Sequence, residues 1–231
     1  MDTKRLALPE LERLRRLGSC TVSNAVESFG VRLRNTGFTD SSVHCLFPAF
    51  PPVVGYAATA RIRTSAFPME GHRYQDRTEW LNHVLSIPEP RIVVLEDLDN
   101  PPGLGSFIGE IHATILNALG CVGVVTNGAV RDLPAVEAIK FHMFAQNVSV
   151  SHSYSHIFDF GGPVVVGGMK VEPGNLLHGD LHGVLTVPLA IAPKVADAAE
   201  EILRREQSVI ALCRSSEFSI EKLRDAAKDW I

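Results

Sequence analysis

The spacing of apolar residues predicts an α/β fold with helices at both ends of the chain. Apolar positions recur with helical spacing over residues 9–17 and 21–29, and again over 192–213 and 220–230. The first two segments are expected to form short helices that pack as an N-terminal lid. The last two predict a helical extension at the C-terminus.

Between these ends, the pattern changes from helical spacing to short apolar runs. Residues Val53–Thr64 alternate in the manner of a strand, and Tyr74–Leu85 predicts an amphipathic helix that ends before Pro88. A βαβα unit follows: strand Arg91–Glu96, a glycine-rich loop, helix Glu110–Leu119, strand Cys121–Thr126, a glycine turn and helix Leu133–Ile139. This order predicts a sheet that is at least partly parallel.

Beyond the βαβα unit, short apolar segments separated by Gly and Pro predict a second, more antiparallel layer. These segments are Val148–Val150, Val164–Val171, Leu176–His178 and Val184–Val187. No internal repeat or low-complexity linker interrupts the chain. We therefore expect one domain over residues 1–231, with N-terminal helices in 1–30 and a C-terminal helical extension in 190–231.

Composition narrows the range of partners. With 231 residues, 45% of them apolar, the chain can bury a full core, and a net charge of −4 without any block of like charge offers no basic stripe for nucleic acid or an anionic membrane. Apolar runs such as Pro163–Gly168 are too short to span a bilayer, and residues 1–17 lack a signal-peptide core. We expect a soluble, cytoplasmic protein.

The four cysteines are widely spaced and contain no C-x-x-C pair, which argues against a zinc knuckle and a disulfide scaffold. They are Cys20, Cys45, Cys121 and Cys213. We expect them to be reduced and mostly in the core.

The most informative segment is Gly123–Pro134, because it places Arg131 and Asp132 side by side at a strand-to-helix turn. Asp132 has two equally weighted interpretations, as the N-cap of the following helix or as a metal ligand. The guanidinium of Arg131 suits bidentate recognition of a carboxylate and is hard to explain by packing.

A second glycine-rich loop, Gly103–Gly109, leads into the helix that begins at Glu110. Unpaired N–H groups and the helix dipole make such a junction suitable for an anion. Its G-x-G-x-x-x-G spacing is one residue too long for a dinucleotide fingerprint. Glu110 has a simpler explanation as an acidic residue in a first helical turn, but with Arg131 and Asp132 it also suits Mg²⁺ and a chelating 2-oxo acid.

Two pairs of histidines offer a rival metal site. His152 and His156 are four residues apart, as are His178 and His182. Strand-like alternation around the first pair and glycines around the second argue against the helix that would bring each pair together. No cysteine or third histidine completes a zinc spacing, so hydrogen-bonded or surface histidines are the favoured interpretation.

The chain resembles the RraA-like family, which includes 4-hydroxy-4-methyl-2-oxoglutarate/4-carboxy-4-hydroxy-2-oxoadipate aldolases with oxaloacetate decarboxylase activity, and regulators of ribonuclease E. The resemblance runs from about Thr21 to Pro188, and its specific part is Gly128–Asp132 placed after Gly109-Glu110. Supporting segments are Gly55–Ala60, Pro173–Asp180 and Gly183-Val184.

This resemblance implies an α-β-β-α sandwich with mixed sheets, similar to swivelling domains, assembled as a homotrimer or homohexamer with active sites between protomers. It implies that Arg131 binds the 2-oxo acid, that Asp132 coordinates Mg²⁺ or Mn²⁺, and that Glu110 holds metal-bound water. The amides of the loop are implied to hold the pyruvate carboxylate, which points to Gly109, Glu110, Ile111 and His112. A glutamate from the C-terminal helix of a neighbouring protomer is implied too, and Glu206 is the candidate.

The resulting hypothesis is a metal-dependent aldolase or decarboxylase that releases pyruvate from a small 2-oxo acid. The chain departs from the family pattern at Asn127, Asn24 and His182, where acidic residues are usual. The alternative is a non-catalytic regulator of the ribonuclease E type; Asp132 and the long tail after Pro188 favour the enzyme. A module that binds a 2-oxo acid without converting it is the third possibility.

Overall fold

The computed structural model describes residues 5–68 and 77–228. The helices are α1 (Leu8–Arg15), α2 (Ser19–Ser28), α3 (Arg77–Ser86), α4 (Glu110–Ala118), α5 (Leu133–Ala138), α6 (Ala192–Arg214) and α7 (Ile220–Ala226). The strands are β1 (His44–Cys45), β2 (Val53–Arg63), β3 (Arg91–Asp97), β4 (Ser106–Ile108), β5 (Cys121–Val130), β6 (His142–Val148), β7 (His156–Phe160), β8 (Val164–Val166), β9 (Met169–Val171), β10 (Leu176–Asp180) and β11 (Gly183–Val187).

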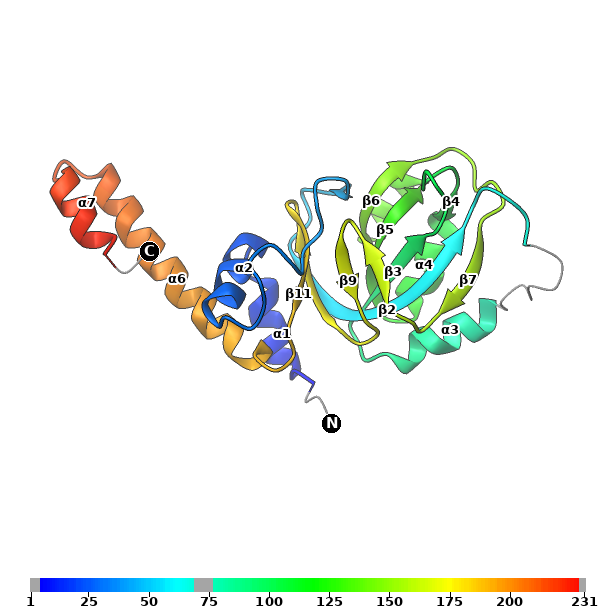
Figure 1. The fold of residues 1–231 in the computed structure, drawn as a ribbon, viewed down its shortest axis with the longest axis horizontal. Coiled ribbons are helices and arrows are strands. Elements are labelled where there is room, and N and C mark those ends of the chain that lie inside the picture. Colours follow the sequence, from blue (N-terminus) through cyan, green and yellow to red (C-terminus); the bar gives the residue numbers. More distant parts are fainter. Residues whose placement is uncertain (1–4, 69–76, 229–231) are drawn as a thin grey trace.

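Nine of the described strands form one mixed sheet that curves until it is nearly closed (Figure 1). Its order is β1-β6-β5-β3-β2-β10-β11, with β4 attached to β5 and β7 attached to β2. The central strands β2, β3, β5 and β6 are parallel, whereas β1, β7, β10 and β11 pair antiparallel. The expected α/β class with mixed pairing and helices at both ends is confirmed.

Alternating side chains of β2 supply two cores, one on each face of the sheet. Val54, Tyr56 and Ala58 belong to the larger core, which the helices cover. Val53 and Ala57 point to the opposite face, where the β8–β9 hairpin covers a smaller core. The period of two in this strand therefore reflects burial on both faces.

Several sequence predictions need correction. The strand expected at Val148–Val150 is β6, which ends at Val148; β4 and β7 were not predicted. The segment Val164–Val171 is a hairpin rather than one strand, because Gly167 and Gly168 adopt positive φ angles of 53° and 71°. The expected antiparallel layer is not separate, since β10 and β11 extend the main sheet.

The helices agree more closely with their predictions. Those expected near 9–17, 21–29 and 110–119 appear as α1, α2 and α4. The start predicted for the helix Tyr74–Leu85 lies outside the described residues, as does the end of the helix predicted over 220–230. None of the described helices combines the length and apolar character needed to cross a bilayer.

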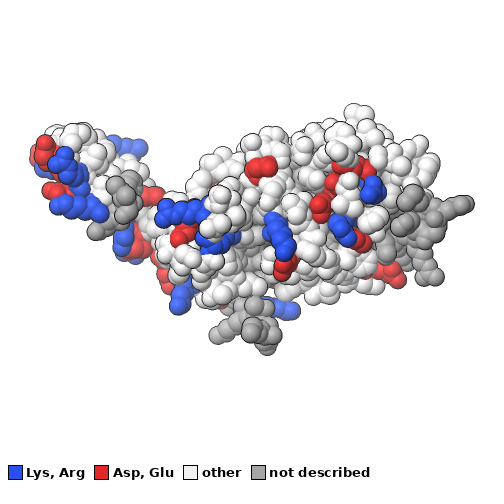
Figure 2. Space-filling view, viewed as in Figure 1, with Lys and Arg blue, Asp and Glu red and all other residues white. Residues whose placement is uncertain are grey.

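The N-terminal helices do not form a lid over the candidate site. α1 and α2 pack against α6, and α2 also contacts β10 and β11. They lie at the opposite end of the sheet from β4 and α4 (Figure 1). From there α6 projects away from the body of the molecule, and α7 folds back against α6. On the face seen in Figure 2, this projecting arm carries Lys and Arg interspersed with Asp and Glu.

Candidate functional site

The turn that carries Arg131 and Asp132 follows directly from the end of β5. This strand continues to Val130, past the glycine turn predicted at Asn127-Gly128, and its pairing with β6 is irregular between Thr126 and Ala129. Asn127 and Gly128 are therefore a bulge within the strand rather than a turn. The chain then leaves the sheet at Arg131, whose N–H donates to the carbonyl of Ile108 at 3.0 Å.

Asp132 occupies the N-cap position of α5, but its side chain does not cap that helix. The residue is left-handed, with φ 58° and ψ 36°, and its carboxylate makes no hydrogen bond to the α5 amides. Instead Oδ2 accepts the backbone N–H of Glu110 at 3.0 Å and lies 3.4 Å from Nε of Arg131. The capping interpretation is therefore wrong for this side chain, which faces the first turn of α4.

Gly109 allows this close approach. A Cβ at Gly109 would collide with Oδ2 of Asp132 and lie 3.0 Å from Cγ of Arg131. The absence of a side chain lets the two residues of the β5–α5 turn lie directly against the start of α4. Helix geometry leaves the first backbone N–H groups of α4 without acceptors inside the helix. The carboxylate of Asp132 accepts one of them, the N–H of Glu110.

Asn127, which departs from the family pattern, does not belong to this cluster. Its Oδ1 accepts the N–H of Asp97 at 2.7 Å, and its Nδ2 donates to the carbonyl of Asp97 at 3.0 Å. The side chain therefore joins β5 to the end of β3 by a two-way bridge, which an ionised carboxylate could not make.

Two buried aspartates that the sequence analysis missed hold the loops around the site. Asp97 accepts the N–H groups of Gly103 and Asp99, at 2.8 and 3.1 Å, and burial raises its pKa. Asp99 accepts the backbone N–H groups of Thr64 and Ser65 at 2.6 and 2.8 Å, and these bonds lower its pKa although burial opposes them. An acidic residue at the end of a buried strand was the signal available in the sequence.

These elements surround a cavity of about 620 Å³. Every predicted binding residue of the α4 start lines it, and so do Arg131 and Asp132 with exposed side-chain fractions of 34% and 40%. The predicted residues are Gly109, Glu110, Ile111 and His112. The structure thus brings the two glycine-containing segments of the sequence together, as expected. The apolar part of the lining was not foreseen; it includes Trp80 from α3, Phe107 from β4 and Tyr154.

The histidine pairs do not form a metal centre of their own. His152 and His156 line the cavity, where their Nδ1 atoms face the carbonyls of Ser153 and Tyr154. No group of three His, Cys, Asp or Glu side chains suited to a metal occurs in the described residues.

The second pair lies in β10 and in the turn that follows it. His178 is fully buried with its Nε2 3.1 Å from the carbonyl of Leu14, and burial lowers its pKa. His182 hydrogen bonds to Asp180, which also accepts the N–H of Ser19 at 2.7 Å. Burial acts to raise the pKa of Asp180, but these bonds outweigh it, so the pKa is lowered. This cluster anchors α2 to the sheet.

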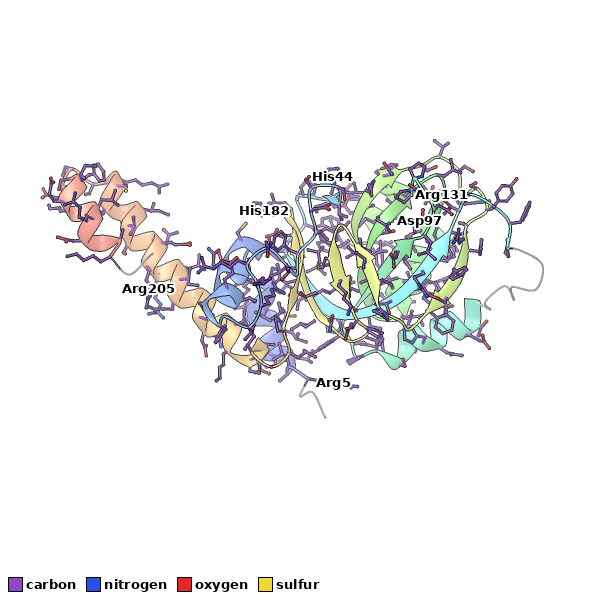
Figure 3. All side chains as sticks on the ribbon, viewed as in Figure 1. Arg5, His44, Asp97, Arg131, His182 and Arg205 are labelled. Atoms are coloured by element: carbon purple, nitrogen blue, oxygen red, sulfur yellow. The ribbon has the colours of Figure 1, made fainter. Side chains whose placement is uncertain are left out.

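Two further predictions have different outcomes. Glu206 lies on α6, and its neighbour Arg205 is far along the projecting arm from Arg131 (Figure 3). Within one chain it does not reach the cavity, so its predicted role in a neighbouring protomer stays a prediction. The four cysteines are free, but Cys20 and Cys213 are exposed, so the expectation of a mostly buried set was wrong.

Three comparisons place the chain among known proteins. A protein of Halalkalibacterium halodurans named "Putative 4-hydroxy-4-methyl-2-oxoglutarate aldolase" is 30% identical over 97 residues, which is 42% of this chain and 46% of that protein. An uncharacterized protein of Pseudomonas syringae has the same fold, with a TM-score of 0.75 at 21% identity over 97% of this chain and 96% of that one. Streptomyces coelicolor RraAS2, described as an unusual member of the RNase ES inhibitor RraA protein family, also has this fold. Its TM-score is 0.69 at 22% identity, and the match covers 88% of this chain and 96% of that one.

The family comparison covers more of the chain than the pairwise match does. The model of the family described as "RraA-like: Aldolase/RraA" matches residues 19–186, a span that contains the α4 start, the β5–α5 turn and the whole cavity lining. The chain therefore belongs to the RraA-like family.

Proposed function

We propose that the protein is a divalent-metal-dependent lyase that cleaves a C–C bond of a 2-oxo acid, of the 4-hydroxy-4-methyl-2-oxoglutarate or oxaloacetate kind, and releases pyruvate. The observation that carries the proposal is the hydrogen bond from the Glu110 amide to Asp132. It fixes a carboxylate beside a guanidinium and a helix N-terminus, all within one cavity.

The donor set fits Mg²⁺ or Mn²⁺. One oxygen of Asp132 is taken by the Glu110 amide, whereas Oδ1 has no hydrogen bond to any described residue and the side chain is 40% exposed. Hard divalent cations are commonly held by one or two carboxylates, with water and substrate oxygens as the remaining ligands. Asp132 would hold the cation, with Glu110 nearby and Glu206 of a neighbouring protomer as a further candidate. When bound, the cation supplies a Lewis acid for the negative charge that develops on the 2-oxo group.

The chain's own residues would perform the other tasks. Arg131 and the first-turn amides of α4 other than that of Glu110 bind and orient the substrate carboxylate, because they present N–H donors to the same region of the cavity. Glu110 is exposed at the cavity wall, where its carboxylate can orient a water molecule that accepts the proton of the substrate hydroxyl. The same water can later return a proton to C3 of the pyruvate enolate. A homotrimer or homohexamer, as the resemblance implies, is part of the proposal.

The test couples pyruvate release to lactate dehydrogenase. Oxaloacetate and 4-hydroxy-4-methyl-2-oxoglutarate are offered with Mg²⁺, with Mn²⁺ and with EDTA, and the rate of metal alone is subtracted. We expect Asp132→Ala and Arg131→Ala each to lower kcat/KM by about a hundred- to a thousand-fold, the usual loss for a stabiliser of developing charge. Arg34→Ala, at a side chain that is 84% exposed and does not line the cavity, is the matched control and should keep the wild-type rate. Equal, metal-independent rates for wild type and Asp132→Ala would refute the lyase.

A further inference from the structure

The cavity is chemically asymmetric. Charged groups occupy the region of Arg131, Asp132 and Glu110, whereas much of the remaining wall is apolar. Leu81 and Trp80 contribute from α3, and further apolar side chains come from α4 and β4. A small, fully polar substrate would leave this apolar wall in contact with water, at a cost in free energy that grows with its area.

Aromatic contacts order the apolar wall. The rings of Trp80 and Phe107 meet edge to face, with centroids 5.6 Å apart, and Phe107 lies 4.9 Å from the ring of His112. Across the cavity, Phe67 and Tyr154 pack with centroids 4.1 Å apart. Rings held in this way offer a preformed surface for a flat or branched apolar group.

One polar atom of Trp80 has no hydrogen-bond partner among the residues that the structure describes. Trp80 is 1% exposed, and its indole Nε1–H has no hydrogen-bond acceptor among the described residues. Buried indole N–H groups normally have an acceptor, because an unsatisfied donor costs free energy. An acceptor that reached this edge of the ring would offset that cost.

Within residues 5–68 and 77–228, the cavity lining supplies one permanent cation for a substrate carboxylate. Arg131 is the one Arg or Lys among the described residues of the lining, and it already lies beside Asp132 and Glu110. The Nδ1 atoms of His152 and His156 face the backbone carbonyls of Ser153 and Tyr154, so both rings contact main-chain acceptors. Beyond Arg131, the described lining therefore offers no Arg or Lys to pair with a second substrate carboxylate, whose desolvation in the apolar part would be costly.

We propose that the preferred substrate of this lyase is a 4-hydroxy-2-oxo monocarboxylic acid whose C4 bears a bulky apolar group, aryl or branched alkyl. This inference rests on the proposed lyase function and names its substrate class. Arg131 and the α4 amides bind the single carboxylate, and the apolar group packs between Trp80 and Phe107. The C3–C4 bond breaks, its electron pair passes to C3, and the hydroxyl proton leaves to water. The products are pyruvate, after protonation at C3, and an apolar aldehyde or ketone.

A binding experiment tests the ligand class without requiring turnover. 2-Oxo-4-phenylbutanoate and 2-oxoglutarate share the 2-oxo acid end, and neither has the hydroxyl needed for cleavage. Calorimetric titration of the Mg²⁺-loaded protein at pH 8 should give the phenyl compound at least about tenfold tighter binding, from the apolar area it buries. Equal affinities, tighter binding of 2-oxoglutarate, or no binding of either compound would overturn the inference.

Ile115 allows a matched reversal of this preference. It lines the cavity from α4, and it is 39% exposed, so a longer polar side chain can be accommodated there. Ile115→Arg adds a second cation and should reverse the preference toward 2-oxoglutarate by about tenfold, the usual strength of a charge-assisted hydrogen bond. Ile115→Gln has similar helix propensity and no charge, so it should weaken binding of the phenyl compound without strengthening that of 2-oxoglutarate. An unchanged preference in Ile115→Arg would contradict the proposed orientation.

Turnover separates failure of this inference from failure of the lyase. With 4-hydroxy-2-oxo-4-phenylbutanoate, kcat/KM should exceed that for 4-hydroxy-4-methyl-2-oxoglutarate by about tenfold or more. Faster cleavage of the methyl dicarboxylate would overturn the substrate class and leave the lyase intact. A preference for the phenyl compound in binding, without pyruvate release from any substrate, would refute the lyase and retain the ligand class.

Discussion

Replacing Asn127 by aspartate should destabilise the protein, even though family members commonly carry an acidic residue there. In this chain the side-chain oxygen of Asn127 accepts the backbone N–H of Asp97 at 2.7 Å, and its NH₂ group donates to the carbonyl of Asp97 at 3.0 Å. An ionised carboxylate keeps the first bond, loses the second, and sets a negative oxygen against the carbonyl. The side chain is partly buried, so water replaces the lost donor poorly.

The magnitude follows from these two terms. Loss of one hydrogen bond together with an unsatisfied, repelled carbonyl costs about 2 kcal/mol. For a chain of this length, that lowers Tm by about 4–8 °C. The carboxyl form can donate again, so the folded protein should raise the pKa of the introduced aspartate above its unfolded value of about 3.9. The deficit relative to wild type should then be full above the raised pKa and disappear as the pH falls below it.

Thermal unfolding of wild type and Asn127→Asp, followed by circular dichroism at pH 7.5 and 4.5, measures both effects. Asn175→Asp is the matched control: Oδ1 of Asn175 accepts the N–H of Glu172 at 2.9 Å, and its NH₂ group donates to no described residue. That variant should unfold within about 1–2 °C of wild type, since a carboxylate can replace an amide oxygen as acceptor. An Asn127→Asp variant as stable as wild type at pH 7.5 would refute the two-way bridge.

Three further predictions follow from single side chains. Burial, and after it the charge of Arg15, lowers the pKa of His142 to about 4. The contribution of this histidine to stability is therefore present above pH 6.5 and lost as the pH falls toward 4. Urea unfolding of wild type should show this loss, and His142→Phe should reduce it. Burial raises the pKa of Cys121 to about 12, so Ellman's reagent should label exposed Cys20 and Cys213 rapidly and leave Cys121 unmodified until the protein unfolds. Gly109→Ala should displace Asp132 and lower kcat/KM by about tenfold or more at nearly unchanged Tm, whereas Gly162→Ala, where a Cβ meets nothing within 4 Å, should leave both unchanged.

The βαβα unit and the reacting end of the site could be predicted because local signals decide them. The helical period of α4, the apolar run of β5 and the adjacent Arg131-Asp132 pair lie within one short stretch of sequence. The end of β5 was less predictable, because Asn127-Gly128 has the composition of a turn. Pairing with β6 on one side and the Asn127 bridge on the other keep this dipeptide within the strand.

Long-range contacts explain what the sequence did not reveal. The role of Asp132 depended on a bond to Glu110, 22 residues away, which no local pattern encodes. β7 was missed because its pairing with β2 joins residues nearly a hundred positions apart. The apolar wall was missed for the same reason, since Trp80, Phe107 and Tyr154 come from three separate segments.

The groups assigned to the reaction and the apolar wall are therefore two separate properties of the cavity. The groups assigned to the reaction contact one another: the Glu110 amide donates to Asp132, Asp132 contacts Arg131, and Gly109 lets both lie against the start of α4. Any change in one of them displaces the others, so their effects on catalysis should not be additive. The apolar wall is assembled differently, because α3 and the segment around Tyr154 reach the cavity from separate parts of the chain. Substitutions there can change which apolar group is accepted while the carboxylate and cation positions stay fixed. A site built in this way can retain its chemistry while its substrate changes.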